Sequence, residues 1–307
     1  MDTRSLREFI RLGRFPFLLS GFIPFTAGAL LAFLLGARFT PAQFLIGYAA
    51  MAAAHLSVHY SNDYFDADAD RFVETTPISG GSGVLAANPD LKPVAFRAAV
   101  ALMAVSVLIG YFFVTVYAYP VVFLVFGIAG NLLGWFYTAP PLAFAYHNLG
   151  EVTNMITFGL LMPGAGYFVA MGTLDAAFFA FAVPLCLYGL VFITSVEIPD
   201  REGDIAGGKR TLVVRKGRVF GFWLIALAAT LATASLAVFA LTDFFAPVDF
   251  WPVALVSLIP LGIALWGFLH RCAGRACTLP FAVANIVGYF LFQGLVVIYF
   301  IYAAVSA

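Results

Sequence analysis

The chain has very little charge. Only 10% of its 307 residues are Asp, Glu, Lys or Arg, whereas a typical soluble domain has about a quarter. At the same time, 63% of the residues are hydrophobic and the mean hydropathy is +0.97. A water-soluble fold cannot bury that much apolar surface. The composition therefore excludes a soluble globular protein and predicts a protein embedded in lipid.

Cysteine is also scarce, with only Cys186, Cys272 and Cys277. An odd count, with Cys186 inside an apolar run, argues against a disulfide framework. Cys272 and Cys277 lack the further ligands of a zinc site, so we predict three structural cysteines. The first apolar run lacks a small-residue cleavage site after it, which predicts a retained helix rather than a signal peptide. The net charge is zero, and no nucleic-acid partner is expected.

Apolar runs of about the 20 residues that cross a bilayer recur along the chain. They predict an all-α, polytopic membrane protein with about nine transmembrane helices around a central cavity, forming a single domain over residues 1–307. The predicted spans are residues 15–36, 41–61, 94–117, 119–137, 151–171, 176–197, 218–241, 250–269 and 281–305.

The positions of the basic residues support this count. Fifteen of the sixteen Lys and Arg residues fall at the N-terminus or in the connections after the second, fourth, sixth and eighth spans, and only Arg38 falls on the other side. The positive-inside rule then places the N-terminus in the cytoplasm. We expect a plasma-membrane protein whose two long loops, 62–93 and 198–217, lie on the cytoplasmic side.

An acidic motif follows the second predicted span, within Asn62–Asp70. Asp63, Asp66 and Asp70 would share one face if the helix continues through them. Carboxylates packed this closely repel one another, and a divalent cation would relieve that repulsion. Mg²⁺ prefers one or two carboxylates together with waters and phosphate oxygens. The alternative is an acidic helix end exposed to solvent.

A second acidic motif ends the sixth span, on the same side of the membrane. Glu197, Asp200 and Asp204 repeat the spacing of three and four. Solvation alone does not explain two such motifs at equivalent helix ends. The pair predicts that both motifs bind one diphosphate through Mg²⁺, which would make the diphosphate a leaving group.

Basic and glycine-rich segments accompany these motifs. Arg14, Arg71, Lys209 and Arg210 have the charge and geometry to contact phosphate oxygens, although the positive-inside bias explains the last three equally well. The loop Ser79–Gly83 would bring backbone N–H groups to an anion, or serve as a connector.

A few polar residues lie within the predicted spans, where such groups usually face the bundle interior. His55 and His59 lie four residues apart on the helix that carries the first motif. No third metal ligand is visible, so we favour a hydrogen bond between helices over metal ligation. Asn154 lies one turn from Glu151, and we expect both to point into the same cavity.

Several segments together resemble the UbiA superfamily of intramembrane prenyltransferases. They are Asn62–Asp70, Glu197–Asp204, Gly208–Leu212, Tyr137–Pro141 and Leu149–Glu151. Gly80–Leu85 and Gly208–Leu212 look most like the 1,4-dihydroxy-2-naphthoate prenyltransferases of menaquinone synthesis.

The resemblance implies a role for each matching residue. Mg²⁺ and the diphosphate would be bound by Asn62, Asp63, Asp66, Asp70, Glu197, Asp200 and Asp204. Phosphate would be contacted by Arg71, Lys209 and Arg210. Arg14 and Tyr137 would lie near the reacting centre. Together with Asp66 and Asp200 they are the predicted catalytic residues, and Asn154 is predicted to bind substrate. The chain departs from the pattern twice: Ala143–Ala145 replaces a stretch that often carries lysine, which bears on the acceptor, and Glu197 stands where aspartate is common.

We therefore predict Mg²⁺-dependent transfer of a polyprenyl group from an isoprenyl diphosphate to an aromatic acceptor, with 1,4-dihydroxy-2-naphthoate favoured. Other acceptors of the superfamily stay open: 4-hydroxybenzoate, homogentisate, haem, chlorophyllide or a glyceryl phosphate. A cation-coupled transporter is a weaker alternative, because transporters usually place their acids near mid-membrane.

Overall fold

The computed structural model describes residues 3–72 and 81–306, and every regular element among them is a helix. The long unbroken helices are α2 (Leu18–Leu34), α3 (Pro41–Asp66), α5 (Lys92–Val116), α6 (Val121–Trp135), α9 (Ala176–Ala206), α11 (Arg218–Thr242) and α14 (Arg275–Ser306). Two other long segments consist of consecutive pieces, namely α7 (Gly150–Ile156), η5 (Thr157–Leu161) and α8 (Met162–Met171), and then α12 (Trp251–Val256) and α13 (Leu258–Leu269). The short elements are α1 (Thr3–Gly13), η1 (Phe15–Phe17), η2 (Ala69–Phe72), α4 (Val84–Ala87), η3 (Pro89–Leu91), η4 (Phe144–Tyr146) and α10 (Leu212–Lys216).

Within the described residues, seven helical segments are long and apolar enough to cross a membrane. The apolar helix α6 is shorter than these seven, and α3 is long but carries polar residues along its second half. Each of the nine predicted spans coincides with one long helical segment of the structure, with ends that differ by up to nine residues. An all-helical, multi-pass architecture is thus confirmed, whereas the number of crossings and the cytoplasmic N-terminus stay predictions.

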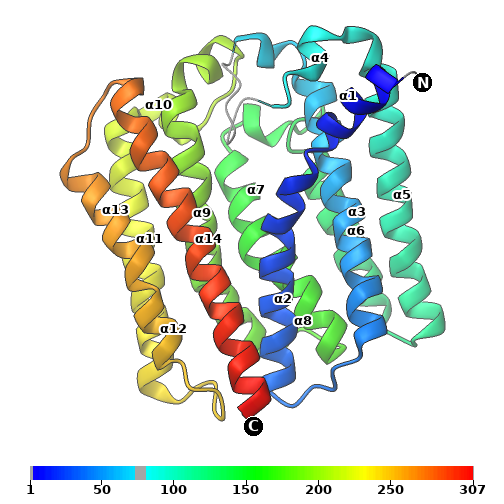
Figure 1. The fold of residues 1–307 in the computed structure, drawn as a ribbon, viewed down its shortest axis with the longest axis vertical. Helices are drawn as coiled ribbons and strands as arrows, with labels where there is room; N and C mark the ends of the chain where they lie inside the picture. Colours follow the sequence, from blue (N-terminus) through cyan, green and yellow to red (C-terminus); the bar gives the residue numbers. More distant parts are fainter. Residues whose placement is uncertain (1–2, 73–80, 307) are drawn as a thin grey trace.

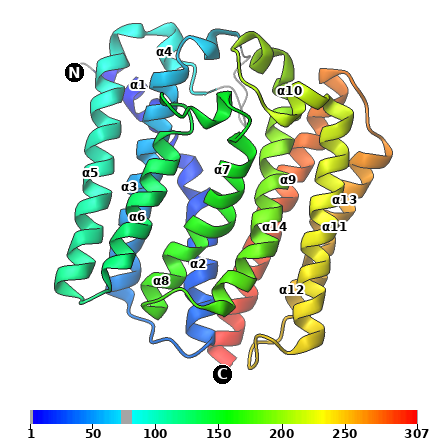
Figure 2. The same cartoon turned by 180° about the vertical axis from the view of Figure 1, so that it is seen from behind.

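The long helices stand side by side, with α1, α4 and α10 gathered at one end of the bundle and the C-terminus at the other (Figure 1). From behind, the segment from α7 to α8 lies between α6 and α9 (Figure 2). The end of α3 and the end of α9, which carry the two acidic motifs, therefore reach the same end of the bundle. The prediction that both motifs lie on one side is confirmed.

Helices α2 and α8 pack closely through glycines. A Cβ on Gly28 would overlap the carbonyl oxygen of Pro163, and a Cβ on Gly166 would overlap that of Phe25. Small residues allow such close backbone approach in lipid, where the hydrophobic effect between helices is absent. The contact holds the segment from α7 to α8 against α2, and that segment forms one wall of the larger cavity described below.

A disulfide joins Cys272, in the connection between α13 and α14, to Cys277 in the first turn of α14. The argument from the sequence against a disulfide framework is therefore wrong for this pair. The chain turns back into α14 within five residues, which brings the two Cα atoms to 6.4 Å, inside the usual range for a disulfide. Cys186 is free, as predicted.

Candidate functional site

The first acidic motif is divided between two elements. Helix α3 continues beyond its predicted end at residue 61 to Asp66, and both Asp63 and Asp66 are buried. Asp70 belongs to the separate short helix η2. The expected single helical face is therefore wrong, because α3 ends at Asp66 and the chain turns before Asp70.

The second acidic motif lies on a continuous helix. Helix α9 runs through Pro199 to Ala206, so residues 198–206 are helix and not the loop predicted from the sequence. Glu197, Asp200 and Asp204 are all buried along one face of α9. Their spacing of three and four residues thus places them together, as predicted.

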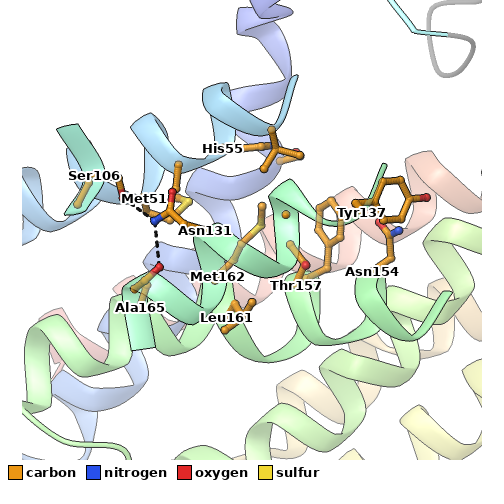
Figure 3. A pocket seen from close by; sticks show the side chains of 18 of the residues that line it. Met51, His55, Ser106, Asn131, Tyr137, Asn154, Thr157, Leu161, Met162 and Ala165 are labelled. Carbon is orange, nitrogen blue, oxygen red and sulfur yellow. Dashed lines mark hydrogen bonds between the residues drawn. The ribbon is translucent and has the colours of Figure 1, made fainter. Parts of the chain in front are cut away.

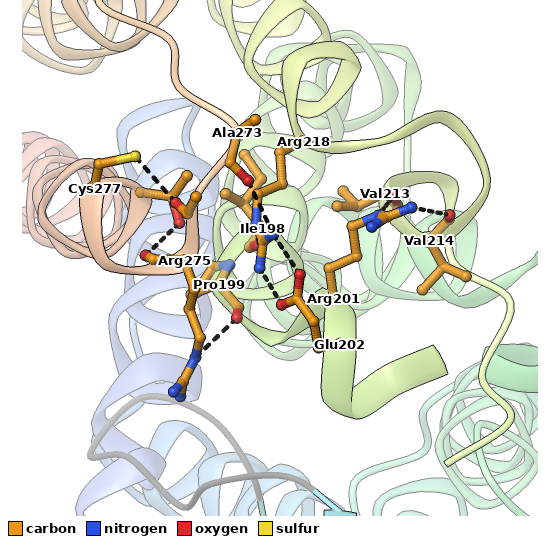
Figure 4. A network of polar contacts seen from close by, with 12 residues as sticks. Ile198, Pro199, Arg201, Glu202, Val213, Val214, Arg218, Ala273, Arg275 and Cys277 are labelled. Carbon is orange, nitrogen blue, oxygen red and sulfur yellow. Dashed lines mark hydrogen bonds and ion pairs between the residues drawn. The ribbon is translucent and has the colours of Figure 1, made fainter. Parts of the chain in front are cut away.

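Arg218, the first residue of α11, anchors the end of α9 to α11 and to the connection that precedes α14. Its guanidinium donates hydrogen bonds to the carbonyl of Ile198 at 2.8 Å and to that of Ala273 at 3.1 Å, and it pairs with the carboxylate of Glu202 (Figure 4). Arg218 is itself buried, and a buried guanidinium needs such partners to offset its desolvation. The network fixes the direction in which the acidic face of α9 points.

The two motifs converge on one cavity of about 180 Å³, here called the head cavity. Its lining residues are Arg14, Asn62, Asp63, Asp66, Asp70, Gly81, Tyr137, Ala145, Ile193, Val196, Glu197, Asp200, Asp204, Lys209 and Thr211. All six residues predicted to bind metal are among them. The lining thus contains six carboxylates and two basic side chains, Arg14 and Lys209.

Hydrogen bonds orient the carboxylates of the first motif. Lys209 forms an ion pair with Asp66 at 2.9 Å, and the Tyr146 hydroxyl donates to the other oxygen of Asp66 at 2.8 Å. The hydroxyl of Ser82 donates to Asp63, and the backbone N–H of Ser82 lies 3.3 Å from the same carboxylate. Tyr146 was not predicted as a site residue, and Ser82 was predicted only as part of the glycine-rich loop Ser79–Gly83.

The carboxylates raise the pKa of their neighbours. Burial raises the pKa of Asp70 to about 7, and repulsion by Asp66 and Asp63 adds to this against the attraction of Lys209. For Lys209, burial lowers the pKa, but Asp66 and Asp204 more than offset it and hold that pKa well above its usual value. The head cavity thus contains more negative charge than its own cations can balance.

The surroundings of Glu197 show the same excess of negative charge. Both of its carboxylate oxygens are enclosed and accept no hydrogen bond from a donor within the described part of the chain. Glu151, which accepts a hydrogen bond from the backbone N–H of Leu212, is a neighbouring carboxylate. A buried carboxylate without a donor is costly unless it is protonated or bound to a cation.

A larger and mostly apolar cavity of about 310 Å³, here called the tail cavity, adjoins the head cavity (Figure 3). Five residues line both cavities: Arg14, Asn62, Tyr137, Ile193 and Val196. Aromatic lining residues of the tail cavity include Phe17, Phe123, Phe126, Phe158 and Phe192. The π-helical turn η5, a feature often found at functional sites, contributes Thr157, Phe158 and Leu161 to the wall.

Of the remaining predicted residues, two line a cavity and two lie outside both cavities. Asn154 lines the tail cavity, and Asn62, which accepts a hydrogen bond from Thr138 at 3.0 Å, lies where the cavities meet. Arg71 and Arg210 are exposed and line neither cavity, which argues against their predicted phosphate contacts. Arg71 points outward from η2 and pairs with Asp68 at 3.5 Å.

The glycine-rich loop touches the site at two described residues, Ser82, which donates to Asp63, and Gly81. Ser79 and Gly80, which the sequence analysis included in this loop, lie outside the described residues. Gly81 has φ +64°, which disfavours any side chain, and a Cβ there would overlap the carboxylate of Asp70. The close approach of this backbone therefore sets the position of Asp70.

Replacing Gly81 by Ala should displace Asp70 and weaken divalent-cation binding by about tenfold or more. The measurement is titration of Mg²⁺ in the presence of a non-reactive prenyl diphosphate analogue. Gly36→Ala is the matched control, because Gly36 also has positive φ (+101°) but has nothing near its Cβ position. Equal affinity in the two variants would contradict the role of Gly81.

Comparisons with known proteins agree with this geometry. The UbiA prenyltransferase family matches residues 21–286. A 1,4-dihydroxy-2-naphthoate octaprenyltransferase of Bacillus subtilis is 23% identical over 217 residues, which cover 70% of this chain and 68% of that protein. The mouse UbiA prenyltransferase domain-containing protein 1 is 33% identical over 95 residues, covering 31% of this chain and 28% of that protein.

Solved structures share the fold. A UbiA homologue from Archaeoglobus fulgidus bound to GPP and Mg²⁺ superposes with a TM-score of 0.67 at 16% identity, covering 94% of this chain and 99% of that one. An apo UbiA homologue from Aeropyrum pernix K1 gives 0.65 at 16% identity, with 91% and 97% covered. The family match spans most of the sequence, so this chain belongs to the UbiA prenyltransferase family and is a membrane-embedded prenyltransferase.

Proposed function

We propose that the protein transfers a polyprenyl group from an isoprenyl diphosphate to 1,4-dihydroxy-2-naphthoate in a reaction that depends on Mg²⁺. The observation that carries this proposal is the junction of the two cavities. A cavity rich in carboxylates suits a metal-bound diphosphate, and the adjoining apolar cavity suits a hydrocarbon tail. The naphthoate acceptor is supported by the name of the Bacillus subtilis relative, a 1,4-dihydroxy-2-naphthoate octaprenyltransferase.

The donor atoms of the head cavity fit a hard divalent cation. They are carboxylate oxygens and the amide oxygen of Asn62, which are the ligands that Mg²⁺ prefers. Among the described residues, no three His, Cys, Asp or Glu side chains are close enough to hold one metal by themselves. This agrees with Mg²⁺, which usually completes its coordination with waters and substrate phosphates. A diphosphate would not enter so acidic a cavity without a bridging cation.

The candidate metal ligands are Asp63, Asp66, Asp70, Glu197, Asp200 and Asp204. Bound Mg²⁺ would neutralise the diphosphate and so make it a leaving group. Lys209, oriented by its ion pair with Asp66, would contact a phosphate oxygen from between the two motifs. Arg14 lies where the cavities meet, and its guanidinium is 4.4 Å from the ring centre of Phe17. It would therefore contact the oxygen nearest the breaking bond.

The reaction would take place where the two cavities meet. The bond between the first prenyl carbon and its oxygen breaks, and the electron pair leaves with the diphosphate. The allylic cation that forms would be stabilised by the ring faces of Tyr137, Phe158 and Phe192 and kept from water by the apolar lining. The electron-rich acceptor ring then forms the new carbon–carbon bond and loses its carboxyl group as CO₂.

The orientation in the membrane is part of the proposal. Fifteen of the sixteen Lys and Arg residues fall on one predicted side, and the head cavity lies at the bundle end that carries that side's loops. The positive-inside rule makes this the cytoplasmic side of the plasma membrane. Water-soluble diphosphate would then be released into the cytoplasm.

The direct test is an assay of the purified protein in detergent or vesicles with an isoprenyl diphosphate. We expect diphosphate release and a prenylated naphthoate when 1,4-dihydroxy-2-naphthoate and Mg²⁺ are both present, and neither product after EDTA treatment. Parallel reactions with 4-hydroxybenzoate, homogentisate and a glyceryl phosphate test the acceptor. Transfer to one of these and not to the naphthoate would overturn the acceptor but not the enzyme class.

A further inference from the structure

Two histidines of the tail cavity have no role in the chemistry described so far. His55 and His59 lie one turn apart on α3, with ring centres 4.8 Å apart and ring planes 32° apart. Both line the tail cavity, and Figure 3 shows His55 at its wall. The sequence favoured a hydrogen bond between helices for this pair. Neither ring has a hydrogen-bond partner in the described part of the chain, so that prediction is wrong.

One nitrogen of each ring is enclosed by protein, namely Nδ1 of His55 and Nε2 of His59. His55 Nδ1 faces Gly21 of α2, where a Cβ would lie only 2.9 Å from it. The ring of His59 lies edge-on to that of Phe17, with 5.9 Å between their centres. The opposite nitrogens, Nε2 of His55 and Nδ1 of His59, are therefore left to form hydrogen bonds with whatever occupies the tail cavity.

The position of the pair indicates which substrate it meets. His59 precedes Asn62 by one turn and so lies close to the junction of the cavities, where the prenyl carbon reacts. Asn154 and Thr157 lie across the cavity from α3 (Figure 3). Asn154 already donates to the carbonyl of Gly150 at 3.1 Å, but a prenyl tail has no hydrogen-bonding groups and would leave the cavity-facing histidine nitrogens unsatisfied, at a cost in free energy. A hydroxylated aromatic ring would satisfy them.

We propose that His55 and His59 bind a hydroxyl group of the aromatic acceptor and hold its ring beside the reacting prenyl carbon. The proposal rests on the proposed function and adds a substrate-binding subsite to it. A neutral imidazole has one donor and one acceptor nitrogen, so the pair can bind a phenolic O–H in either direction. The remainder of the tail cavity, between Phe123 and Val169, is left to the prenyl chain.

The test compares two substitutions at each histidine. Phe keeps a ring but removes the hydrogen bond, whereas Gln keeps both a donor and an acceptor. We expect His55→Phe and His59→Phe to raise the KM for 1,4-dihydroxy-2-naphthoate about tenfold, with recovery in the Gln variants and an unchanged KM for the isoprenyl diphosphate. His270→Phe is the matched control, because His270 is exposed at the end of α13 and lines neither cavity.

A second measurement needs no variant. The wild-type protein, without donor, is titrated with the naphthoate and with its dimethyl ether, and the ether should bind about tenfold more weakly. Equal binding of the two ligands, or a rise in the KM for the donor instead of the acceptor, would overturn the subsite. If the wild-type protein prenylates no aromatic compound at all, the proposed function fails first, and the subsite falls with it.

Discussion

Asp66→Asn and Asp200→Asn should each abolish prenyl transfer while the protein stays folded. We expect a loss of at least about 10³-fold in kcat, the scale seen when a preorganised electrostatic contact is removed from an active site. The physical reason is charge, since Asn has nearly the shape of Asp but cannot hold a divalent cation in the same way. Asp66 and Asp200 come from different helices and line the same head cavity. Loss of either should therefore have the same result.

The measurements are Mg²⁺-dependent diphosphate release and the thermal midpoint of unfolding in detergent. Asp68→Asn is the matched control: the same substitution within the same motif, at a side chain that is 79% exposed and paired only with Arg71 in the described structure. It should retain activity within about twofold of the wild type, as surface substitutions usually do. Full activity in both Asp66→Asn and Asp200→Asn would contradict the proposed role of Mg²⁺ in the reaction.

Binding can be separated from turnover in the same variants. A non-reactive prenyl diphosphate analogue should bind the wild-type protein with Mg²⁺ and much more weakly after chelation. In Asp66→Asn the ion pair of Lys209 is also lost, so Lys209 is freed to contact phosphate directly. We therefore expect that variant to retain more metal-independent analogue binding than Asp200→Asn.

The helices were predicted well because the bilayer imposes a length. An apolar run of suitable length is a physical requirement of spanning, so the nine predicted spans coincide with helical segments of the structure. The end of α9 was missed for a related reason. Residues 198–206 are too polar to read as a span, yet they continue as helix because Arg218 and its neighbours anchor them.

The site was predicted only in part, because the spacing of residues along the chain does not show where one helix or loop lies relative to another. The two acidic motifs were identified by their repetition along the chain. Lys209 and Arg71 both follow a motif, and only the fold places Lys209 inside the cavity and Arg71 outside it. Tyr146 reaches Asp66 across 80 residues of sequence. Nothing local to Tyr146 indicates that contact.

Ala165→Phe should shorten the donor that the enzyme accepts. Ala165 lines the tail cavity, and Figure 3 shows it at the end far from Tyr137, where the distal part of a prenyl chain would lie. A benzyl group at this position would fill space that a long chain needs, without reaching the diphosphate. We expect kcat/KM for a donor of many isoprenoid units to fall about a hundredfold, a loss typical of displaced substrate.

The donor with a single isoprenoid unit should be used within about threefold of the wild-type rate, since the reacting end of the site is unchanged. Ala129→Phe is the matched control: Ala129 is an exposed residue of α6 that lines neither cavity, so the same substitution there adds its ring outside them. An equal loss for long and short donors would mean that Ala165→Phe damages packing instead of filling the cavity. An unchanged preference in Ala165→Phe would mean that the prenyl chain takes another path, and the tail cavity would then be left for the acceptor alone.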